Sequence, residues 1–304
     1  MSPQAEVKNV TVPWVAAARK RAEPLVMVTA YDCPQGRTAD AAGADVVLVG
    51  DSLAMVVLGY PDTLSVTMEE MLHHVRAVRR GVKRALLVAD MPYGSFHLGT
   101  EPAVGNAIRF VKEAGAQAVK IEGARPEVVG AMVAAEVPVM AHLGLTPQSV
   151  HRLGGFKVQG REKKARQAIL EAALALEAAG AFSLVLECVP ADLAAEITGR
   201  LEIPTIGIGA GPGTDGQVLV FHDMLGLTTG RAPKFVKRYA NLAEDIARAA
   251  TQFAQEVGSG AFPGPEHEYG PNGSGPGVPK PAGFPTPTAR GPRKEEEVKY
   301  GTAG

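Results

Sequence analysis

The sequence predicts an α/β protein of the (β/α)8 barrel class, often called a TIM barrel, on three observations. Eight short apolar runs rich in Val, Ile and Leu can be counted along the chain. Stretches of helical period separate them, so strands and helices alternate. Continuous apolar strands between helices indicate a parallel sheet with both faces covered. Eight such units favour a closed barrel, with an open doubly wound sheet as the alternative.

The individual elements can be placed in order along the chain. Residues 12–22 (VPWVAAARKRA) form an amphipathic pattern, and we expect this helix to cover the bottom of the barrel. A capping box of Thr67 and Glu70 marks one helix start. The clearest helical patterns span 67–80, 101–114, 126–136 and 162–180. The expected strands are 25–30, 44–51, 85–90, 118–122, 137–142, 182–187, 203–209 and, least clearly, 218–221.

Composition divides the chain into two parts. We expect residues 1–264 to form a single catalytic barrel domain, because this length suits one barrel. From Pro263 to Pro292 the sequence is rich in Gly and Pro, and the charged run RKEEEVK follows. Such a segment buries too little surface to offset its ordering entropy. We therefore expect residues 265–304 to be a disordered tail.

Charge and composition exclude several classes of function. The chain of 304 residues has 31 Lys and Arg against 32 Asp and Glu, which disfavours a strongly basic nucleic-acid binder. No apolar run reaches the roughly 18 residues of a membrane span, and the N-terminus lacks the apolar core of a secretory signal. Two cysteines are too few for a disulfide framework. We expect a cytoplasmic enzyme without nucleic-acid or membrane partners.

Ionisable residues end five of the expected strands. The carboxyl ends of parallel strands lie on one face, which is the catalytic face of a barrel. A single such residue is usually a loop residue or a helix cap, but five in register predict a shared site. Several carboxylates at one mouth also need a cation, a proton or a basic partner. The five residues are Asp51, Asp90, Glu122, His142 and Glu187.

The residue types favour magnesium as the compensating cation. Magnesium takes one or two protein carboxylates and completes its octahedron with water and substrate. Asp51 and Asp90 are suited to direct ligation, and Glu122 to ligation directly or through water. Zinc is disfavoured because the chain has no HExxH motif. Strand alternation places Lys120 on the same face as Glu122, where it could bind a substrate carboxylate or neutralise its neighbours.

Glu187 is a candidate general base. The apolar run LVL precedes it and Cys188 follows it. An apolar setting raises the pKa of a carboxylate towards the range that is useful for proton transfer. The simpler interpretation is that Glu187 caps a helix formed by ADLAAEIT (191–198).

Two motifs suggest functions that the rest of the chain does not support. Gly50-Asp51-Ser52-Leu53 matches a hydrolase signature, but no Asp is followed by His three positions later to supply the base. Ser52 is therefore better interpreted as a ligand-binding hydroxyl than as a nucleophile.

The Gly-rich stretch 207–213 fits the dinucleotide fingerprint poorly and follows the seventh strand. It could still admit a flat or anionic ligand at a barrel mouth.

Ten segments of the chain form a recognisable set: VTAYD, VLVGDSL, HHVRAVRRG, VADMP, AGAQAVKIEG, HLGLTPQSV, GGFKVQGR, LVLECVP, IPTIGIGAG and DGQVLVFHDMLGL. Together they closely resemble the ketopantoate hydroxymethyltransferase family. The resemblance runs in order from about residue 10 to residue 268. Ala54 and Tyr93 stand where many relatives have Gly and Phe, and neither change removes a functional group.

The resemblance implies a specific activity. Members transfer a one-carbon unit from the co-substrate 5,10-methylenetetrahydrofolate to 3-methyl-2-oxobutanoate, with magnesium (Mg2+), and form 2-dehydropantoate for pantothenate and coenzyme A synthesis. It also implies a homo-oligomer, and the large ring assemblies of the family suggest a decamer.

By position in the matching motifs, the family's functional residues can be carried over. The substrate-binding set is Asp51, Ser52, Asp90, Lys120 and His142. The metal ligands fall on Asp51 and Asp90, with Glu122 beside them, and the catalytic base falls on Glu187.

Three rival functions remain open from the residues alone. Another barrel enzyme that forms enolates of 2-oxo acids, such as a C–C lyase, would differ in not requiring the methylene-folate donor. A hydrolase would lose essentially all turnover on Ser52→Ala. A non-enzymatic scaffold would bind no magnesium at the strand ends.

Overall fold

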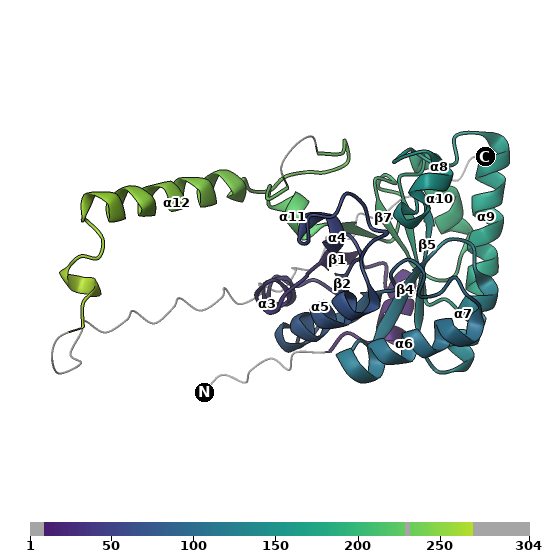
Figure 1. The fold of residues 1–304 in the computed structure, drawn as a ribbon. Helices are drawn as coiled ribbons and strands as arrows, with labels where there is room; N and C mark the ends of the chain where they lie inside the picture. The colour runs from purple at the N-terminus through teal and green to yellow at the C-terminus, as the bar shows by residue number, and fades with distance from the viewer. Residues whose placement is uncertain (1–8, 229–231, 270–304) are drawn as a thin grey trace, which may run out of the picture.

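The computed structural model describes residues 9–228 and 232–269 and shows a closed barrel of eight parallel strands. The strands pair in sequence order, and β8 pairs with β1 to close the sheet (Figure 1). This confirms the predicted barrel and excludes the open sheet. The strands are β1 (Leu25–Thr29), β2 (Val46–Val49), β3 (Leu86–Asp90), β4 (Ala118–Glu122), β5 (Val139–Gly144), β6 (Ser183–Glu187), β7 (Thr205–Ile208) and β8 (Gly216–Leu219).

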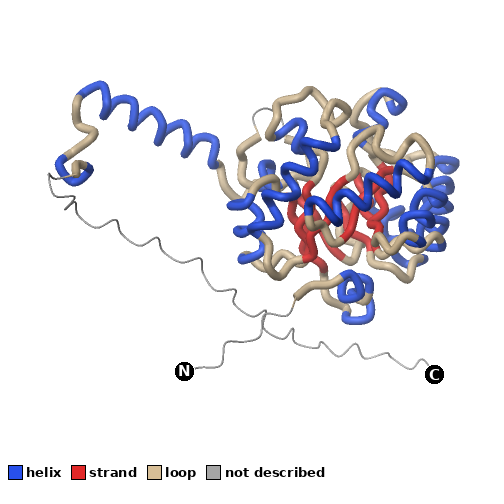
Figure 2. The backbone as a smooth tube through the Cα atoms, turned by 60° about the horizontal axis from the view of Figure 1, so that its bottom comes forward, coloured by secondary structure: helices blue, strands red, loops and turns tan. Residues whose placement is uncertain are grey.

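Helices surround most of the barrel (Figure 2). Each of the first six strands is followed by at least one helix, whereas β7 connects to β8 without a described helix. The helices are α1 (Val12–Ala16), α2 (Ala18–Arg21), α3 (Cys33–Ala41), α4 (Leu53–Val56), α5 (Met68–Gly81), α6 (Thr100–Ala114), α7 (Pro126–Ala134), α8 (Val150–Leu153), α9 (Lys163–Ala178), α10 (Ala191–Arg200), α11 (Phe221–Met224) and α12 (Leu242–Ser259), with 3-10 turns η1 (Pro147–Ser149) and η2 (Pro265–His267).

Strand side chains alternate between two apolar layers, as period-2 geometry requires. On β2, Val46 and Leu48 belong to the cluster inside the barrel, while Val47 and Val49 pack in the outer cluster beneath the helices. Along β3, Leu86 and Val88 continue the interior rows. The same alternation directs polar residues at the carboxyl ends of the strands into the mouth of the barrel.

The N-terminal segment covers the opposite end of the barrel, as predicted. It forms two short helices, α1 and α2, where the sequence predicted one continuous helix. Val10, Val15 and Ala18 pack in the interior cluster with Leu25. The hydroxyl of Thr11 accepts a hydrogen bond from Trp14 N and caps the start of α1.

The predicted strands and longer barrel helices match the observed ones closely, whereas the shorter helices α3, α4, α8 and α11 were not predicted. The capping box at Thr67 and Glu70 is present at the start of α5, and both of its backbone hydrogen bonds form. The eighth strand begins two residues earlier than predicted, at Gly216. Helix α12 was not predicted at all. Of the predicted tail, residues 265–269 contain the turn η2, and residues 270–304 lie outside the described residues.

Within the described ranges, no helix is both long and apolar enough to cross a membrane.

Candidate active site

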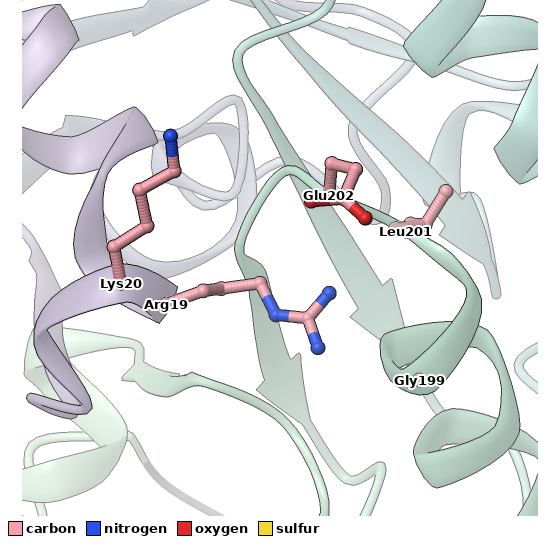
Figure 3. Close-up of a pocket in the computed structure, with 5 residues that line it drawn as sticks. All are labelled: Arg19, Lys20, Gly199, Leu201 and Glu202. Carbon is pink, nitrogen blue, oxygen red and sulfur yellow. The ribbon is translucent and has the colours of Figure 1, made fainter.

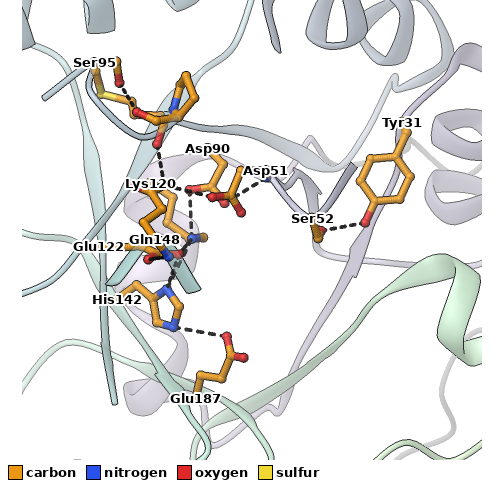
Figure 4. Close-up of polar contacts among 12 residues, drawn as sticks. Tyr31, Asp51, Ser52, Asp90, Ser95, Lys120, Glu122, His142, Gln148 and Glu187 are labelled. Atoms are coloured by element: carbon orange, nitrogen blue, oxygen red, sulfur yellow. Dashed lines mark hydrogen bonds and ion pairs between the residues drawn. The ribbon is translucent and has the colours of Figure 1, made fainter. Parts of the chain in front are cut away.

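Strand register brings the predicted polar residues together at the carboxyl ends of the strands (Figure 4). Asp90 on β3 lies beside Lys120 on β4, and Glu122 on β4 lies beside His142 on β5. Each continues an interior row, because strand alternation places it two residues beyond an inward-facing residue. Asp51 follows β2, and its backbone N donates a hydrogen bond of 3.2 Å to Asp90 Oδ2.

Lys120 lies at the centre of this cluster and is almost completely buried. Its Nζ is 2.8 Å from Asp90 Oδ1 and 3.9 Å from Glu122 Oε1. The same atom is 3.3 Å from His142 Nδ1. Burial alone would lower the pKa of Lys120, but the charges of Asp90, Glu122 and Asp51 raise it well above its usual range. Lys120 therefore stays a cation at neutral pH.

His142 connects this cluster to Glu187 at the end of β6. Its Nδ1 lies 3.5 Å from Glu122 Oε1, and its Nε2 lies 3.3 Å from Glu187 Oε2. Burial and the charge of Lys120 oppose protonation, yet the hydrogen bonds to Glu122 and Glu187 outweigh them and raise the pKa of His142. His142 thus lies between two carboxylates, with its buried Nε2 within ion-pair distance of Glu187.

Glu187 differs from the other carboxylates of the cluster in its exposure. Its side chain is 18% exposed, whereas that of Glu122 is 3% exposed. The apolar setting predicted for Glu187 is therefore incomplete, and a small molecule at the mouth can reach this carboxylate. The alternative role as a helix cap is not supported, because α10 begins after Pro190 without a side-chain cap.

The buried carboxylates repel one another. Burial, together with the charges of Asp90 and Glu122, raises the pKa of Asp51 well above its usual range. Burial also raises the pKa of Asp90, although the neighbouring Lys120 opposes this shift. For Glu122 burial acts in the same direction, but His142 and Lys120 prevail and lower its pKa. Three carboxylates face one lysine here, so a bound cation would relieve the excess negative charge.

The carboxylate oxygens of this cluster are chemically suited to bind a hard divalent cation. Asp51, Asp90 and Glu122 offer carboxylate oxygens, which are the ligands that magnesium prefers. With the side chains placed as they are, no three His, Cys, Asp or Glu residues in the described ranges form a ready-made metal cluster. Binding would thus require the carboxylates to reorient, or water and substrate to supply most of the ligands.

Gln148, which the sequence analysis did not single out, organises the cluster. Its Nε2 donates hydrogen bonds of 2.9 Å to Asp51 Oδ2 and to the carbonyl oxygen of Met91. Its backbone N donates a hydrogen bond of 3.0 Å to Glu122 Oε2. Gln148 lies in the turn η1 within the motif HLGLTPQSV, where no charge signals a site residue. One residue therefore holds two of the predicted metal ligands.

Ser52 and Tyr31 form a second polar chain at the mouth. Tyr31 Oη lies 2.8 Å from Ser52 Oγ and accepts a hydrogen bond of 2.8 Å from Thr29 Oγ1. Thr29 Oγ1 in turn accepts a hydrogen bond of 2.9 Å from Phe221 N. Burial raises the pKa of Tyr31, so its phenol stays neutral. The hydrogen bond to a neutral phenol gives Ser52 no base of the kind that a hydrolase nucleophile needs.

The Gly-rich stretch after β7 uses its glycines for packing. A Cβ at Gly211 would lie 2.5 Å from Ala191 Cβ, and one at Gly213 would lie 2.8 Å from Ala195 Cβ. Both neighbours belong to α10. Glycine is thus needed here for a close approach between loop and helix.

A separate pocket lies at the other end of the barrel (Figure 3). Its lining includes Arg19 of α2 and Glu202, which precedes β7. Arg19 also pairs with Asp215, at 3.4 Å, just before β8. These positions precede the strands, so the pocket is remote from the polar cluster in the mouth.

Comparison with known proteins identifies the family. The model of ketopantoate hydroxymethyltransferase matches residues 9–265. The chain belongs to this family. It is 55% identical over 266 residues to 3-methyl-2-oxobutanoate hydroxymethyltransferase of Nitratidesulfovibrio vulgaris, a match that covers 87% of this chain and 86% of the relative. The Thermobifida fusca protein of the same name is 56% identical, with 86% and 94% covered. Family membership makes the chain a hydroxymethyltransferase, as its sequence motifs predicted.

Solved structures support the fold independently. The chain resembles 2,3-dimethylmalate lyase, a member of the PEP mutase/isocitrate lyase superfamily, with a TM-score of 0.54 and 16% identity over 86% of this chain and 93% of the other. Phosphonopyruvate hydrolase in complex with oxalate and magnesium also gives a TM-score of 0.54 and 16% identity, over 82% and 88%. At this identity the likeness shows the barrel fold.

Proposed function

We propose that the polar cluster at the barrel mouth catalyses magnesium-dependent hydroxymethyl transfer from 5,10-methylenetetrahydrofolate to 3-methyl-2-oxobutanoate. The product would be 2-dehydropantoate, for pantothenate and coenzyme A synthesis. The observation that carries this proposal is the contact between His142 and the partly exposed Glu187, beside a buried set of carboxylates. It occurs in a chain that is more than half identical to proteins named for this activity.

The substrate offers a carboxylate and a ketone that this site can bind. The neighbouring carboxylates raise the pKa of Lys120 and favour its cationic form, and Ser52 presents a hydroxyl 2.8 Å from Tyr31 Oη. Both are suited to a substrate carboxylate. Asp51, Asp90 and Glu122 would hold magnesium, with Gln148 restricting the positions of Asp51 and Glu122. Magnesium, when bound, would polarise the ketone and stabilise negative charge on its oxygen.

Proton removal from C3 falls to Glu187 in this proposal. The carboxylate takes the C3 proton, and the bonding electrons move into an enolate. His142 keeps the accepting oxygen in place through its contact at 3.3 Å. Water adds its oxygen to the methylene carbon as the two bonds from that carbon to the folate nitrogens break, and the two hydrogens of the water end on those nitrogens, so tetrahydrofolate leaves and the one-carbon unit is at the formaldehyde level. The nucleophilic C3 then forms a bond to this carbon, and its oxygen takes up the proton that Glu187 removed.

We further propose that the chain acts in the cytoplasm as a homo-oligomer. Membership of a family of biosynthetic hydroxymethyltransferases supports this location. The position of α12, which projects from the barrel, supports an assembly of identical chains.

The test of the activity is product formation by the purified full chain. We expect 2-dehydropantoate, detected by mass spectrometry, when the 2-oxo acid, methylenetetrahydrofolate and magnesium are all present, and essentially none when any one is omitted. Turnover of the 2-oxo acid without the folate would favour a C–C lyase instead. Absence of both turnover and magnesium binding would favour a non-enzymatic scaffold.

A further inference from the structure

A strongly basic segment lies at the mouth of the barrel, beside the polar cluster. Residues 151–164, here called the basic segment, contain five Lys and Arg against one Glu, in a chain whose net charge is −1. All five cations are exposed, and none forms an ion pair within residues 9–228 and 232–269. The next cation along the chain, Arg166, pairs instead with Asp192 and Glu196 of α10. The five are Arg152, Lys157, Arg161, Lys163 and Lys164.

The basic segment is attached to the active site at two places. Gln148, three residues before it, bonds to two carboxylates of the cluster. Further along, Gln159 N donates a hydrogen bond of 2.9 Å to the carbonyl oxygen of Cys188, which follows Glu187 (Figure 4). Gly160 packs so closely on α10 that a Cβ there would lie 2.6 Å from a leucine side chain of that helix. These contacts hold the exposed cations beside the candidate base.

The residues of the basic segment match the folate co-substrate in two respects. Phe156 and Val158, on either side of Lys157, are 53% and 40% exposed and give the segment apolar surface. A folate consists of flat rings, which carry the one-carbon unit, and a glutamate tail, which further γ-linked glutamates extend into an oligoanion. Exposed aromatic surface suits the rings, and a group of cations suits the carboxylates of the tail. The small 2-oxo acid needs neither.

We propose that the basic segment binds the glutamate tail of the folate, with Lys157 and Arg161 as the main carboxylate contacts and Phe156 beside the rings. This rests on the proposed function, because it assigns the place of the second substrate of that reaction. The one-carbon unit must reach C3 of the 2-oxo acid beside Glu187, so the tail has to leave the mouth over one of the surrounding loops. The loops after β2, β3, β4 and β6 contain at most one Lys or Arg each, so they offer no comparable surface.

The exposure of these cations determines how binding should depend on tail length and on salt. A single exposed ion pair contributes little, so a tail with one glutamate gains little from this surface. Several carboxylates on one tail add their contributions, and dissolved salt screens each of them. Affinity should therefore rise with the number of glutamates and fall with ionic strength.

Steady-state kinetics of the full wild-type chain tests the proposal, with 5,10-methylenetetrahydrofolate that carries either one or five glutamates. KM for the pentaglutamate should be about tenfold lower than KM for the monoglutamate, with similar kcat, because binding that is equal in the ground and transition states changes KM alone. Raising the salt from about 0.05 M to about 0.5 M should remove most of this difference. Equal KM values for the two folates at low salt would overturn the proposal.

Charge reversal locates the binding surface. Lys157→Glu/Arg161→Glu should abolish the preference for the longer tail by raising KM for the pentaglutamate about tenfold. Lys83→Glu/Lys112→Glu is the matched control, because it makes the same change of charge before β3 and at the end of α6, away from the mouth, and it should keep the preference. A preference that survives Lys157→Glu/Arg161→Glu would refute the assignment.

The segment after α11 is a second basic surface and provides a stricter comparison. Lys234 and Lys237 are exposed there. Lys234→Glu/Lys237→Glu should keep the preference for the pentaglutamate. If this variant lost the preference and the variant of the basic segment did not, the tail would lie after α11 and the proposal would be wrong.

Two measurements separate this proposal from the proposed function. Exchange of the C3 hydrogen of the 2-oxo acid needs no folate, so its retention by Lys157→Glu/Arg161→Glu shows that the site for the 2-oxo acid is intact; if that variant misfolds, Lys157→Gln/Arg161→Gln replaces it. Isothermal titration with tetrahydrofolate mono- and pentaglutamate measures tail binding without turnover. Tighter binding of the pentaglutamate by the wild type alone would support the proposal even if no 2-dehydropantoate formed, and equal affinities would overturn it even if the product did form.

Discussion

At the scale of single residues, the site depends on side chains that hold one another in place. Lys120 joins Asp90 and Glu122, while His142 lies between Glu122 and Glu187. Removing one buried partner leaves the charges of the others uncompensated. The free-energy cost of such a buried charge is larger than the contribution of the lost contact itself. We therefore expect substitutions here to separate binding from chemistry according to which partner is lost.

We expect Asp51→Asn and Asp90→Asn each to abolish activity mainly through lost magnesium binding. An amide keeps the shape of the side chain but removes the negative charge that attracts a dication. Isothermal titration with magnesium measures this directly. Asp45→Asn is the matched control, because Asp45 is also buried but lies just before β2, at the opposite end of the strand, where it accepts a hydrogen bond from Val26 N. Normal magnesium binding by either variant would remove that residue from the ligand set.

Tyr31→Phe should weaken substrate binding more than it slows the chemical step. The change removes the partner that holds the Ser52 hydroxyl at 2.8 Å. Loss of one such hydrogen bond costs about 1 kcal/mol, so KM for the 2-oxo acid should rise about five- to tenfold with a smaller change in kcat. Tyr60→Phe removes a hydroxyl bonded to Glu70 and serves as the control. Equal effects of both variants on KM would argue against a positioning role for Tyr31.

At the scale of elements, strand ends and the turns after them determine where the site residues lie. The sequence predicted which strands end in ionisable residues, because apolar runs followed by Asp, Glu or His can be recognised directly. It could not predict that Asp90 pairs with Lys120 and Glu122 with His142, since register depends on how the barrel closes. Gln148 and Tyr31 lay within recognised motifs, but an amide and a phenol carry no charge pattern that marks them as site residues.

Gly144→Ala should damage the site through the backbone. Gly144 has a φ of 97°, and a Cβ there would overlap the carbonyl oxygen of Glu187. The end of β6 must therefore shift, and a displaced base should lower kcat by about 100-fold. Gly43→Ala is the control for strain alone, because Gly43 has a φ of 88° and a Cβ added there would meet nothing within 4 Å. If both variants lose about 1–3 kcal/mol of stability but neither loses activity, the contact does not position Glu187.

At the scale of the whole molecule, the chain combines a closed barrel with helix α12, which has no residue buried against the core of the barrel. Alternation in the sequence was sufficient to predict the barrel, because the strands and the helices around them bury apolar faces. The same reasoning missed α12, whose residues belong to neither core cluster of the described chain. None of its residues is buried, so it takes no part in the strand–helix alternation that revealed the barrel.

Deletion of residues 270–304 should leave folding and catalysis essentially unchanged. The Pro- and Gly-rich composition offers little apolar surface to a core. Differential scanning calorimetry should show a melting temperature within about 2 °C of the full chain, because the free energy of unfolding is unaltered. A large fall in melting temperature would mean that this segment docks on the folded part or on a neighbouring chain.

Exchange of the C3 hydrogen of 3-methyl-2-oxobutanoate with deuterated solvent tests the central claim most directly, because it reports enolate formation without the folate. The full-length wild type with magnesium should exchange this hydrogen, as followed by proton NMR. Glu187→Gln should still bind magnesium and the 2-oxo acid, since Lys120 and the carboxylates of the cluster are unchanged, but its exchange rate should fall by about two to four orders of magnitude. Exchange by Glu187→Gln at the wild-type rate would contradict the account, with His142 the next candidate for the base.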